Sequence, residues 1–171
     1  KDNNSLNYKE EINKMVEIQK HRGPNSSNIS IVNDRLLLGH NRLSIIDLND
    51  SSNQPFYSND KNYCIVFNGE IYNYLELKRE LKIYYDFKTN SDTEVLLAAY
   101  IHWGKQFLDK LRGMFSLVIY DENKNEVFMC RDRFGVKPFF YTYDDKGNLF
   151  IASEIKALYS IQNNKKKNQK L

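Results

Sequence analysis

Long apolar runs are missing from this sequence of 171 residues. No stretch approaches the roughly 20 apolar residues that a membrane-spanning helix needs, and no signal peptide opens the chain. The net charge is only +3, and the one dense basic run is Lys165-Lys166-Lys167. A nucleic-acid binder usually carries a basic stripe interleaved with aromatic residues. We therefore expect a soluble, cytoplasmic protein without membrane or nucleic-acid partners. A basic nucleic-acid-binding module, favoured by the tail alone, is the distant competitor, and salt-sensitive binding would identify it.

Cysteine is scarce as well, because Cys64 and Cys130 are the only two in the sequence. A small secreted scaffold held by disulfides would carry more. Both cysteines lie in apolar runs, which indicates buried free thiols in a reducing compartment. Neither has a neighbouring histidine or a free amine to serve as base, so we expect neither to be a nucleophile.

The composition is that of one globular domain, with 41% hydrophobic and 27% charged residues. A chain of this length can bury well over half of its unfolded surface. From residue 163 onward the sequence is polar and rich in lysine. We therefore assign residues 1–162 to the domain and residues 163–171 to a solvated tail or linker.

Apolar residues at helical spacing predict a helix over residues 7–20, which Gly23-Pro24 stops. A second helix is expected to start with Asn73 as its cap and to carry Leu75 and Leu81. Ser91 caps a third in the same way, and that helix extends to Trp103. Shorter helices are expected over residues 107–111 and 154–159.

Strand patterns fill much of the rest. Residues 29–32 and 35–40 read as a hairpin, and residues 43–48 as a further extended piece. Residues 63–67 form a continuous apolar run, typical of a strand covered on both faces. Four more strands are expected over residues 114–120, 127–130, 139–143 and 149–152. Because turns separate them, we expect antiparallel pairing, and the pattern as a whole predicts a mixed α/β domain of two sheets with helices outside.

Three charged positions suit a free amino acid. An α-carboxylate favours the planar fork of an arginine, and an α-ammonium favours carboxylates. Arg42 lies at the start of a predicted strand, Glu70 lies beside a glycine at the end of another strand, and Asp92 opens a helix. Each also has an ordinary structural explanation: a surface salt bridge, a tight turn and a helix cap.

Eight short strings, in order, carry a resemblance that covers nearly the whole chain. They lie at residues 21–25 (HRGPN), 40–47 (HNRLSIID), 54–55 (QP), 68–73 (NGEIYN), 91–95 (SDTEV), 113–115 (GMF), 131–138 (RDRFGVKP) and 152–158 (ASEIKAL). Together they resemble the N-terminal class II glutamine amidotransferase domain of the glutamine-hydrolysing asparagine synthetases. The 131–138 string is expected to be structural, with its charges pairing beside a strand end.

The resemblance implies an α+β, N-terminal-nucleophile hydrolase fold: a four-layer αββα sandwich of two antiparallel sheets. It implies hydrolysis of L-glutamine to glutamate and ammonia. By the same resemblance, Asn68 and Gly69 form the oxyanion hole. Arg42 binds the α-carboxylate of glutamine, and Glu70 and Asp92 bind its α-ammonium. Backbone groups of Leu43, Ile45 and Ile46 line the pocket. No metal and no cofactor is expected for this domain.

The same resemblance implies a C-terminal synthetase domain that uses ATP and Mg²⁺ and receives the ammonia. Its pyrophosphate-binding loop, of Ser-Gly-Gly-x-Asp-Ser type, does not occur in these residues. A homodimer is a further expectation. Two alternatives stay open: an amidotransferase domain of an enzyme that amidates sugar acids in surface-polysaccharide synthesis, and a non-catalytic glutamine-binding domain.

The resembled family uses an N-terminal cysteine as its nucleophile, and Lys1 stands first in this sequence. A strand that would follow that cysteine has no counterpart either, because residues 1–7 are polar and resemble a loop. We therefore expect a missing first segment rather than a substituted residue, and no glutaminase activity from these 171 residues alone. The intact mass of the protein would test this expectation.

Overall fold

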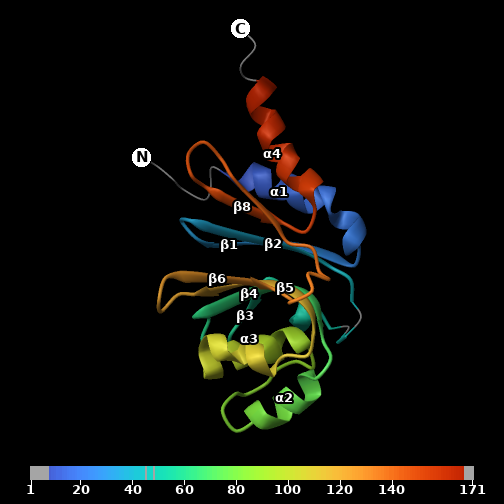
Figure 1. Ribbon diagram of the computed structural model, residues 1–171, viewed down its shortest axis with the longest axis vertical. Coiled ribbons are helices and arrows are strands. Elements are labelled where there is room, and N and C mark those ends of the chain that lie inside the picture. The colour runs from blue at the N-terminus through green and yellow to red at the C-terminus, as the bar shows by residue number, and fades with distance from the viewer. Residues whose placement is uncertain (1–7, 45, 48, 168–171) are drawn as a thin grey trace. The chain divides into compact units, whose positions relative to one another are not determined.

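The computed structural model describes residues 8–44, 46, 47 and 49–167, and it divides into two units (Figure 1). One unit consists of Ser44–Lys137. The other combines Lys1–Leu43 with Pro138–Leu171.

A four-stranded antiparallel sheet organises the Ser44–Lys137 unit, in the order β3-β4-β5-β6. Its strands are β3 (Phe56–Tyr57), β4 (Tyr63–Ile71), β5 (Gly113–Asp121) and β6 (Glu126–Arg131). β4 and β5 pair along their full length, whereas β3 pairs only with Cys64 and Ile65 of β4. Among the described residues, no strand therefore lies beside residues 66–71 on the side of β4 that faces away from β5. We call this part of β4 the open edge.

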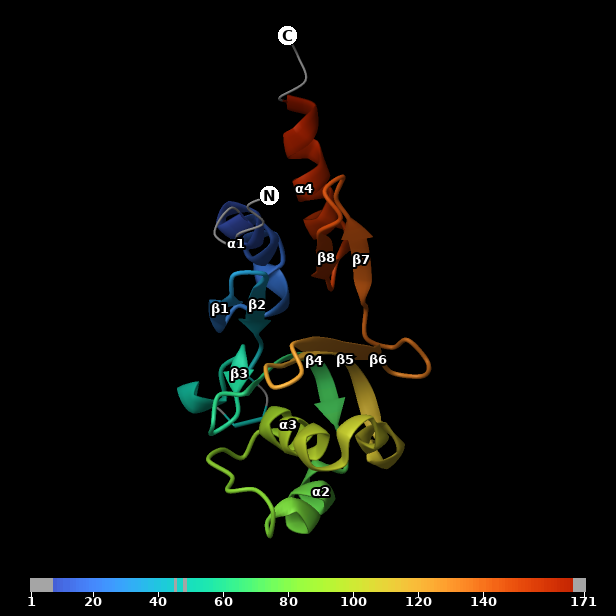
Figure 2. The same ribbon diagram turned by 90° about the vertical axis from the view of Figure 1, so that its left-hand side faces the viewer.

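Two α-helices cover one face of this sheet. They are α2 (Tyr74–Leu81) and α3 (Asp92–Trp103), and two 3₁₀ helices accompany them, η3 (Asp50–Ser52) and η4 (Gly104–Lys110). α3 lies between the sheet and α2 (Figure 2), so residues 92–100 are all buried. This position explains why α3 has apolar side chains on all sides instead of one stripe. The core around it includes Phe67 and Ile71 of β4.

The described residues of the other unit form two hairpins, two α-helices and one 3₁₀ helix. Its elements are α1 (Lys9–Ile18), η2 (Lys20–Arg22), β1 (Ser26–Asn33), β2 (Leu36–Arg42), β7 (Phe140–Tyr143), β8 (Leu149–Ala152) and α4 (Ile155–Lys167). β1 pairs with β2, and β7 pairs with β8, both antiparallel. Met15 of α1 and Leu158 of α4 share a small core with Ala152.

Most of the predicted elements are present, and some boundaries differ. Residues 68–70 were expected to follow the strand that starts at Tyr63, and the structure includes them in β4. The extended piece predicted over residues 43–48 is wrong for its described residues, which form no strand. α4 continues past residue 159 to Lys167 and so enters the segment predicted as a tail. The predictions on residues 1–7 and 168–171 lie outside the described residues.

The start of α2 shows a second difference. Asn73 is the N-cap residue, but its side chain makes no capping hydrogen bond. Its Nδ2 donates to the carbonyl of Lys110 at 2.9 Å, and its Oδ1 accepts from the N–H of Arg112 at 2.9 Å. The amide thus joins α2 to the segment before β5. Leu75 is 57% exposed, and Leu77 takes the buried position beside Leu81.

Candidate active site

The open edge of β4 carries Gly69, a predicted oxyanion donor. The N–H groups of residues two apart in a strand point to the same edge. The N–H of Phe67 donates to Gln54 Oε1 at 2.6 Å, away from β5. The N–H of Ile71 donates to Asp92 Oδ2 at 3.1 Å, also away from β5. The N–H of Gly69, halfway between them, therefore points to the open edge, where a bound group can reach it.

Glycine at position 69 is required by the neighbouring strand. A Cβ at this position would lie 2.2 Å from the carbonyl oxygen of Met114 and 2.8 Å from Cα of Phe115. Phe115 turns its own N–H and carbonyl to Asp132, on the side away from β4. The Gly69–Phe115 pair is thus of the non-hydrogen-bonded type, in which the two Cα atoms come closest. The same backbone feature exposes the N–H and excludes a side chain.

Asn68 and Glu70 flank Gly69, and their side chains share one face of the sheet because strand side chains alternate. Phe67 and Ile71 point to the other face and belong to the core with α3. The side chains of Asn68 and Glu70 are half-buried and lie on the face away from that core. An amide donor, a backbone donor and a carboxylate therefore follow one another along β4.

Asp92 completes this arrangement from another element. It is the first residue of α3 and is 6% exposed, and Ser91 caps the helix by accepting from the N–H of Thr93 at 3.1 Å, as predicted. Burial raises the pKa of Asp92 to about 6, and the charge of nearby Glu70 adds to the rise, although the hydrogen bond from Ile71 opposes it. Two interacting carboxylates, one of them desolvated, favour a cation between them.

Asp47 has a role that the sequence pattern did not reveal. Its Oδ2 accepts from the N–H of Asn90 at 2.8 Å, and its Oδ1 accepts from the N–H and the amide of Asn49. These bonds, the one from Asn90 first, hold the pKa of Asp47 at about 2. Asp47 thereby ties the segment after β2 to the residues that precede Asp92. Nothing in the local sequence pairs positions 47 and 90.

The remaining predicted pocket residues lie around the end of β2. Arg42 ends this strand in the other unit and is 6% exposed. Its carbonyl accepts from the N–H of Asn25 at 3.1 Å. Leu43 is exposed and Ile46 is half-buried, neither in a strand. Ile45 lies outside the described residues.

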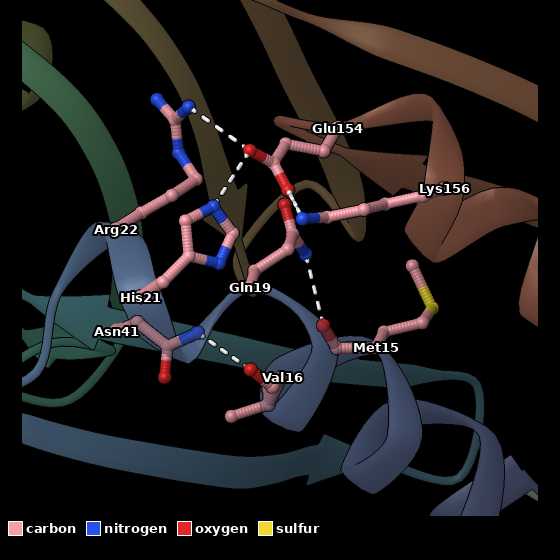
Figure 3. Close-up of polar contacts among 8 residues, drawn as sticks. All are labelled: Met15, Val16, Gln19, His21, Arg22, Asn41, Glu154 and Lys156. Atoms are coloured by element: carbon pink, nitrogen blue, oxygen red, sulfur yellow. Dashed lines mark hydrogen bonds and ion pairs between the residues drawn. The ribbon is translucent and has the colours of Figure 1, made fainter.

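The backbone at Arg42 is packed tightly against Gly23. A Cβ on Gly23 would lie 2.2 Å from the carbonyl oxygen of Asn41 and 2.7 Å from the carbonyl carbon of Arg42. Asn41 also donates from Nδ2 to the carbonyl of Val16 in α1 at 2.7 Å (Figure 3). Helix α1 and the turn after it therefore fix the backbone that carries Arg42.

One carboxylate, Glu154, anchors that turn to the start of α4 (Figure 3). Its Oε1 contacts His21 Nε2 at 3.0 Å and an Arg22 guanidinium nitrogen at 3.4 Å, and its Oε2 contacts Lys156 Nζ at 3.0 Å. Burial alone would raise the pKa of Glu154, but the bonds from Lys156 and His21 outweigh it, and the pKa lies below its ordinary value. Two strings of the resemblance, 21–25 and 152–158, thus meet at one carboxylate.

We expect Glu154→Gln to lower the free energy of unfolding at pH 7 by about 1 kcal/mol, because the cations are partly exposed and water screens them. A carboxylate with a lowered pKa stabilises the fold above its unfolded-state pKa of about 4.5 and loses this effect as pH falls through the folded-state pKa. The difference should therefore shrink below pH 4.5 and in high salt. Urea unfolding measures it, with Glu17→Gln as the control, since the side chain of Glu17 is exposed and forms an ion pair with Lys20 at 3.6 Å. A loss that is equal at pH 7 and pH 3 would contradict this account.

The 131–138 string is structural, as predicted, but the side chains of Arg131 and Asp132 bind backbone groups. The carboxylate of Asp132 accepts from the N–H groups of Phe115, Phe134, Val136 and Lys137. The guanidinium of Arg131 donates to the carbonyls of Gly135 and Lys137. The two side chains shape the loop between β6 and β7.

Neither cysteine suits a nucleophile. Cys64 is 1% exposed inside β4, and Cys130 is half-buried in β6. Burial raises the pKa of each thiol to about 12, so the reactive thiolate is scarce at neutral pH.

Within the described residues, no group of three His, Cys, Asp or Glu side chains is arranged to hold a metal ion. In the same part of the chain, no helix is long and apolar enough to cross a membrane.

Comparison with known proteins identifies the family to which the chain is similar. A family model described as glutamine amidotransferase domain matches residues 2–171. Asparagine synthetase B (glutamine-hydrolysing) of Escherichia coli is 43% identical over 84% of the chain and 26% of its own length. Asparagine synthetase 1 (glutamine-hydrolysing) of Bacillus subtilis is 43% identical over 93% of the chain and 25% of its own length. Amidase chry2 of Gibberella zeae is 40% identical over 86% of the chain and 22% of its own length. The chain spans about a quarter of these relatives.

Proposed function

The chain belongs to the glutamine amidotransferase domain family, and from this premise we propose that it hydrolyses the side-chain amide of L-glutamine to glutamate and ammonia. The observation that carries the proposal is the N–H of Gly69, which points to the open edge of β4 between two N–H groups already taken by side chains. Acyl transfer from an amide passes through a tetrahedral oxyanion, which needs donors fixed in advance. Gly69 and the neighbouring amide of Asn68 supply two.

The charged residues bind the amino-acid end of glutamine in this proposal. Glu70 and Asp92 attract the α-ammonium, because both are carboxylates and they lie close enough for the charge of Glu70 to add to the burial that raises the pKa of Asp92. Arg42 binds the α-carboxylate, and backbone groups of Leu43, Ile45 and Ile46 line the pocket. The nucleophile in the proposal is an N-terminal cysteine, as the resemblance implies, since the environments of Cys64 and Cys130 disfavour their thiolates.

The fold in finer detail is part of the same proposal: an N-terminal-nucleophile hydrolase fold with four layers, αββα. The antiparallel pairing in all three described sheets supports it, and so does the helical cover on one face of the four-stranded sheet.

The whole protein that we propose is a glutamine-dependent asparagine synthetase. Its synthetase domain would use ATP and Mg²⁺ to activate aspartate and would receive the ammonia. The protein would act in the cytoplasm, and a homodimer is part of the proposal. The relative named as an amidase shows that this type of domain also occurs in proteins with other names. The acceptor of the ammonia is therefore a separate question from the reaction in this domain.

A titration of the full-length protein with L-glutamine tests the proposal, with ammonia and glutamate measured together. We expect one ammonia for each glutamate and no release from D-glutamine. Glutamine binding without ammonia would favour a non-catalytic glutamine-binding domain, and no binding would refute the proposal. Addition of ATP and aspartate, or of a sugar acid, then identifies the acceptor by the amide that forms.

We expect Arg42→Lys to raise KM for glutamine about tenfold and to leave kcat within about twofold. Lysine keeps the charge but cannot present two parallel N–H donors to a carboxylate. The steady-state rate of ammonia release measures both constants. Arg35→Lys is the matched control, because Arg35 lies in the β1–β2 turn, where its backbone N–H binds Asn33. An unchanged KM for Arg42→Lys would remove Arg42 from the pocket.

A further inference from the structure

A buried amide, that of Gln54, joins the open edge of β4 to the start of α3. The residue is 7% exposed, and both ends of its carboxamide are used. Oε1 accepts from the N–H of Phe67 at 2.6 Å, and Nε2 donates to Thr93 Oγ1 at 3.2 Å. Because one end accepts and the other donates, an amide is the side chain that satisfies both contacts without a charge.

The position of this amide on the edge is informative. β3 pairs with β4 only as far as Ile65, so a strand no longer supports the edge at Phe67. Gln54 takes the place of that strand on one side of Gly69, and Asp92 does so on the other side, at Ile71. The N–H of Gly69 is therefore held between two side-chain acceptors, each of which contacts the backbone N–H two residues away.

The two acceptors are also coupled to each other. Thr93, whose hydroxyl accepts the hydrogen bond from Gln54 Nε2, directly follows Asp92 in the first turn of α3. The hydroxyl of Thr93 is thus one residue from the carboxylate that accepts from Ile71. A shift of α3 along β4 would stretch both contacts at once. Gln54 opposes such a shift because it links Thr93 of α3 to Phe67, two residues before Gly69 in β4.

We propose that Gln54 is a positioning residue, which fixes the backbone donor of Gly69 relative to Asp92 by joining Phe67 to Thr93. This inference rests on the proposed glutaminase function and deepens it. Gln54 does not touch the substrate, and its effect passes through the two backbone segments that it connects. Gln54, the first residue of the string at residues 54–55, thereby has a physical role in the site.

Gln54→Met in the full-length protein tests this, because methionine keeps the length and volume of the side chain and removes both hydrogen bonds. An oxyanion donor acts in the transition state, so kcat should fall about tenfold while KM changes less than about threefold. Gln106→Met, on the exposed surface of η4, is the matched control and should keep both constants. A folded Gln54→Met protein with unchanged kcat, or with its whole loss in KM, would overturn the proposal.

Substitutions of Thr93 give a second test of the proposal. This test remains possible if the Gln54→Met protein fails to fold. Thr93→Val removes one hydrogen bond and should lower kcat, whereas Thr93→Ser keeps the hydroxyl and should restore it. In a double-mutant cycle the effects of Gln54→Met and Thr93→Val should be less than additive, because both break the same contact. Full additivity, or equal kcat for the valine and serine variants, would contradict the coupling.

Hydrogen exchange separates this inference from the proposed function. In Gln54→Met, amide exchange over residues 66–71 should become at least about tenfold faster than in the unsubstituted protein, since the N–H of Phe67 loses its acceptor. Unchanged exchange there would overturn the structural part of the proposal. If the unsubstituted protein binds no glutamine and releases no ammonia, the proposed function fails, and the positioning role in catalysis fails with it.

Discussion

Asn68→Ala is expected to lower kcat for glutamine hydrolysis about 100- to 1000-fold, with KM within about threefold of its original value. The amide of Asn68 is a neutral donor that needs no change of protonation, and it neighbours the N–H of Gly69 along β4. The charge on the carbonyl oxygen develops only in the transition state. Removal of the donor therefore raises the barrier and leaves the bound ground state almost unchanged.

The measurement is the steady-state release of ammonia by the full-length protein, followed from well below to well above KM. Asn123→Ala is the control, because Asn123 is exposed in the β5–β6 turn, where its amide donates to the hydroxyl of Tyr63 at 3.4 Å. Thermal unfolding should show that both variants fold. An unchanged turnover number for Asn68→Ala, or a loss confined to KM, would exclude Asn68 from the oxyanion hole.

Local pattern was sufficient for the elements that carry the site. Ser91 was expected to open a helix because a hydroxyl cap precedes an apolar run, and its side chain accepts from the N–H of Thr93. The apolar run from Tyr63 was expected to form a strand, and it forms the first part of β4. Caps and apolar runs depend on residues within a few positions of each other, so one sequence can reveal them.

Contacts between distant segments were beyond the reach of such patterns. Gln54 meets Thr93 across 39 positions, and Asp47 meets Asn90 across 43. A second limit concerns Glu94, whose partners lie only five and six positions away. Glu94 lies three residues after Ser91, where a capping box would pair it with the N–H of Ser91, but it accepts from the N–H groups of Lys88 and Thr89. A polar side chain can therefore bind a local partner other than the one that its position in a motif favours.

The sequence did not predict to which side of β4 each backbone N–H points. Asn68-Gly69-Glu70 reads equally well as a turn or as the end of a strand. The bonds from Phe67 and Ile71, together with the non-hydrogen-bonded pairing of Gly69 with Phe115, establish that the N–H of Gly69 points away from β5. Neither composition nor spacing predicts the direction of this backbone N–H. Its direction shows on which side of β4 a substrate oxygen would bind.

The substitution Asp92→Asn is expected to act on function and stability in opposite directions. It should lower kcat/KM for glutamine about 100-fold at pH 7.5, mostly through KM, because a buried charge that binds an ammonium is removed. It should also raise the free energy of unfolding by about 1 kcal/mol at that pH. Burial gives Asp92 a pKa of about 6 against an ordinary value of 3.8, so its charge destabilises the folded state above pH 6. Asparagine removes this cost but has one side-chain oxygen in place of two to accept from backbone N–H groups, which limits the gain.

The pH dependence separates these effects. In the unsubstituted protein, kcat/KM should fall as pH decreases below about 6, because a protonated Asp92 no longer attracts the ammonium of glutamine. The variant should lack this step, and its advantage in stability should fade as pH falls from 6 toward 3.8. Asp109→Asn, on the exposed side of η4, is the control and should change neither profile. An Asp92→Asn protein that binds glutamine normally at pH 7.5 would refute the ammonium site. If the Asp92→Asn protein instead unfolds more easily at pH 7.5, the hydrogen bond from Ile71 stabilises the fold by more than the buried charge costs. The main role of Asp92 would then be to support β4 and not to bind the ammonium.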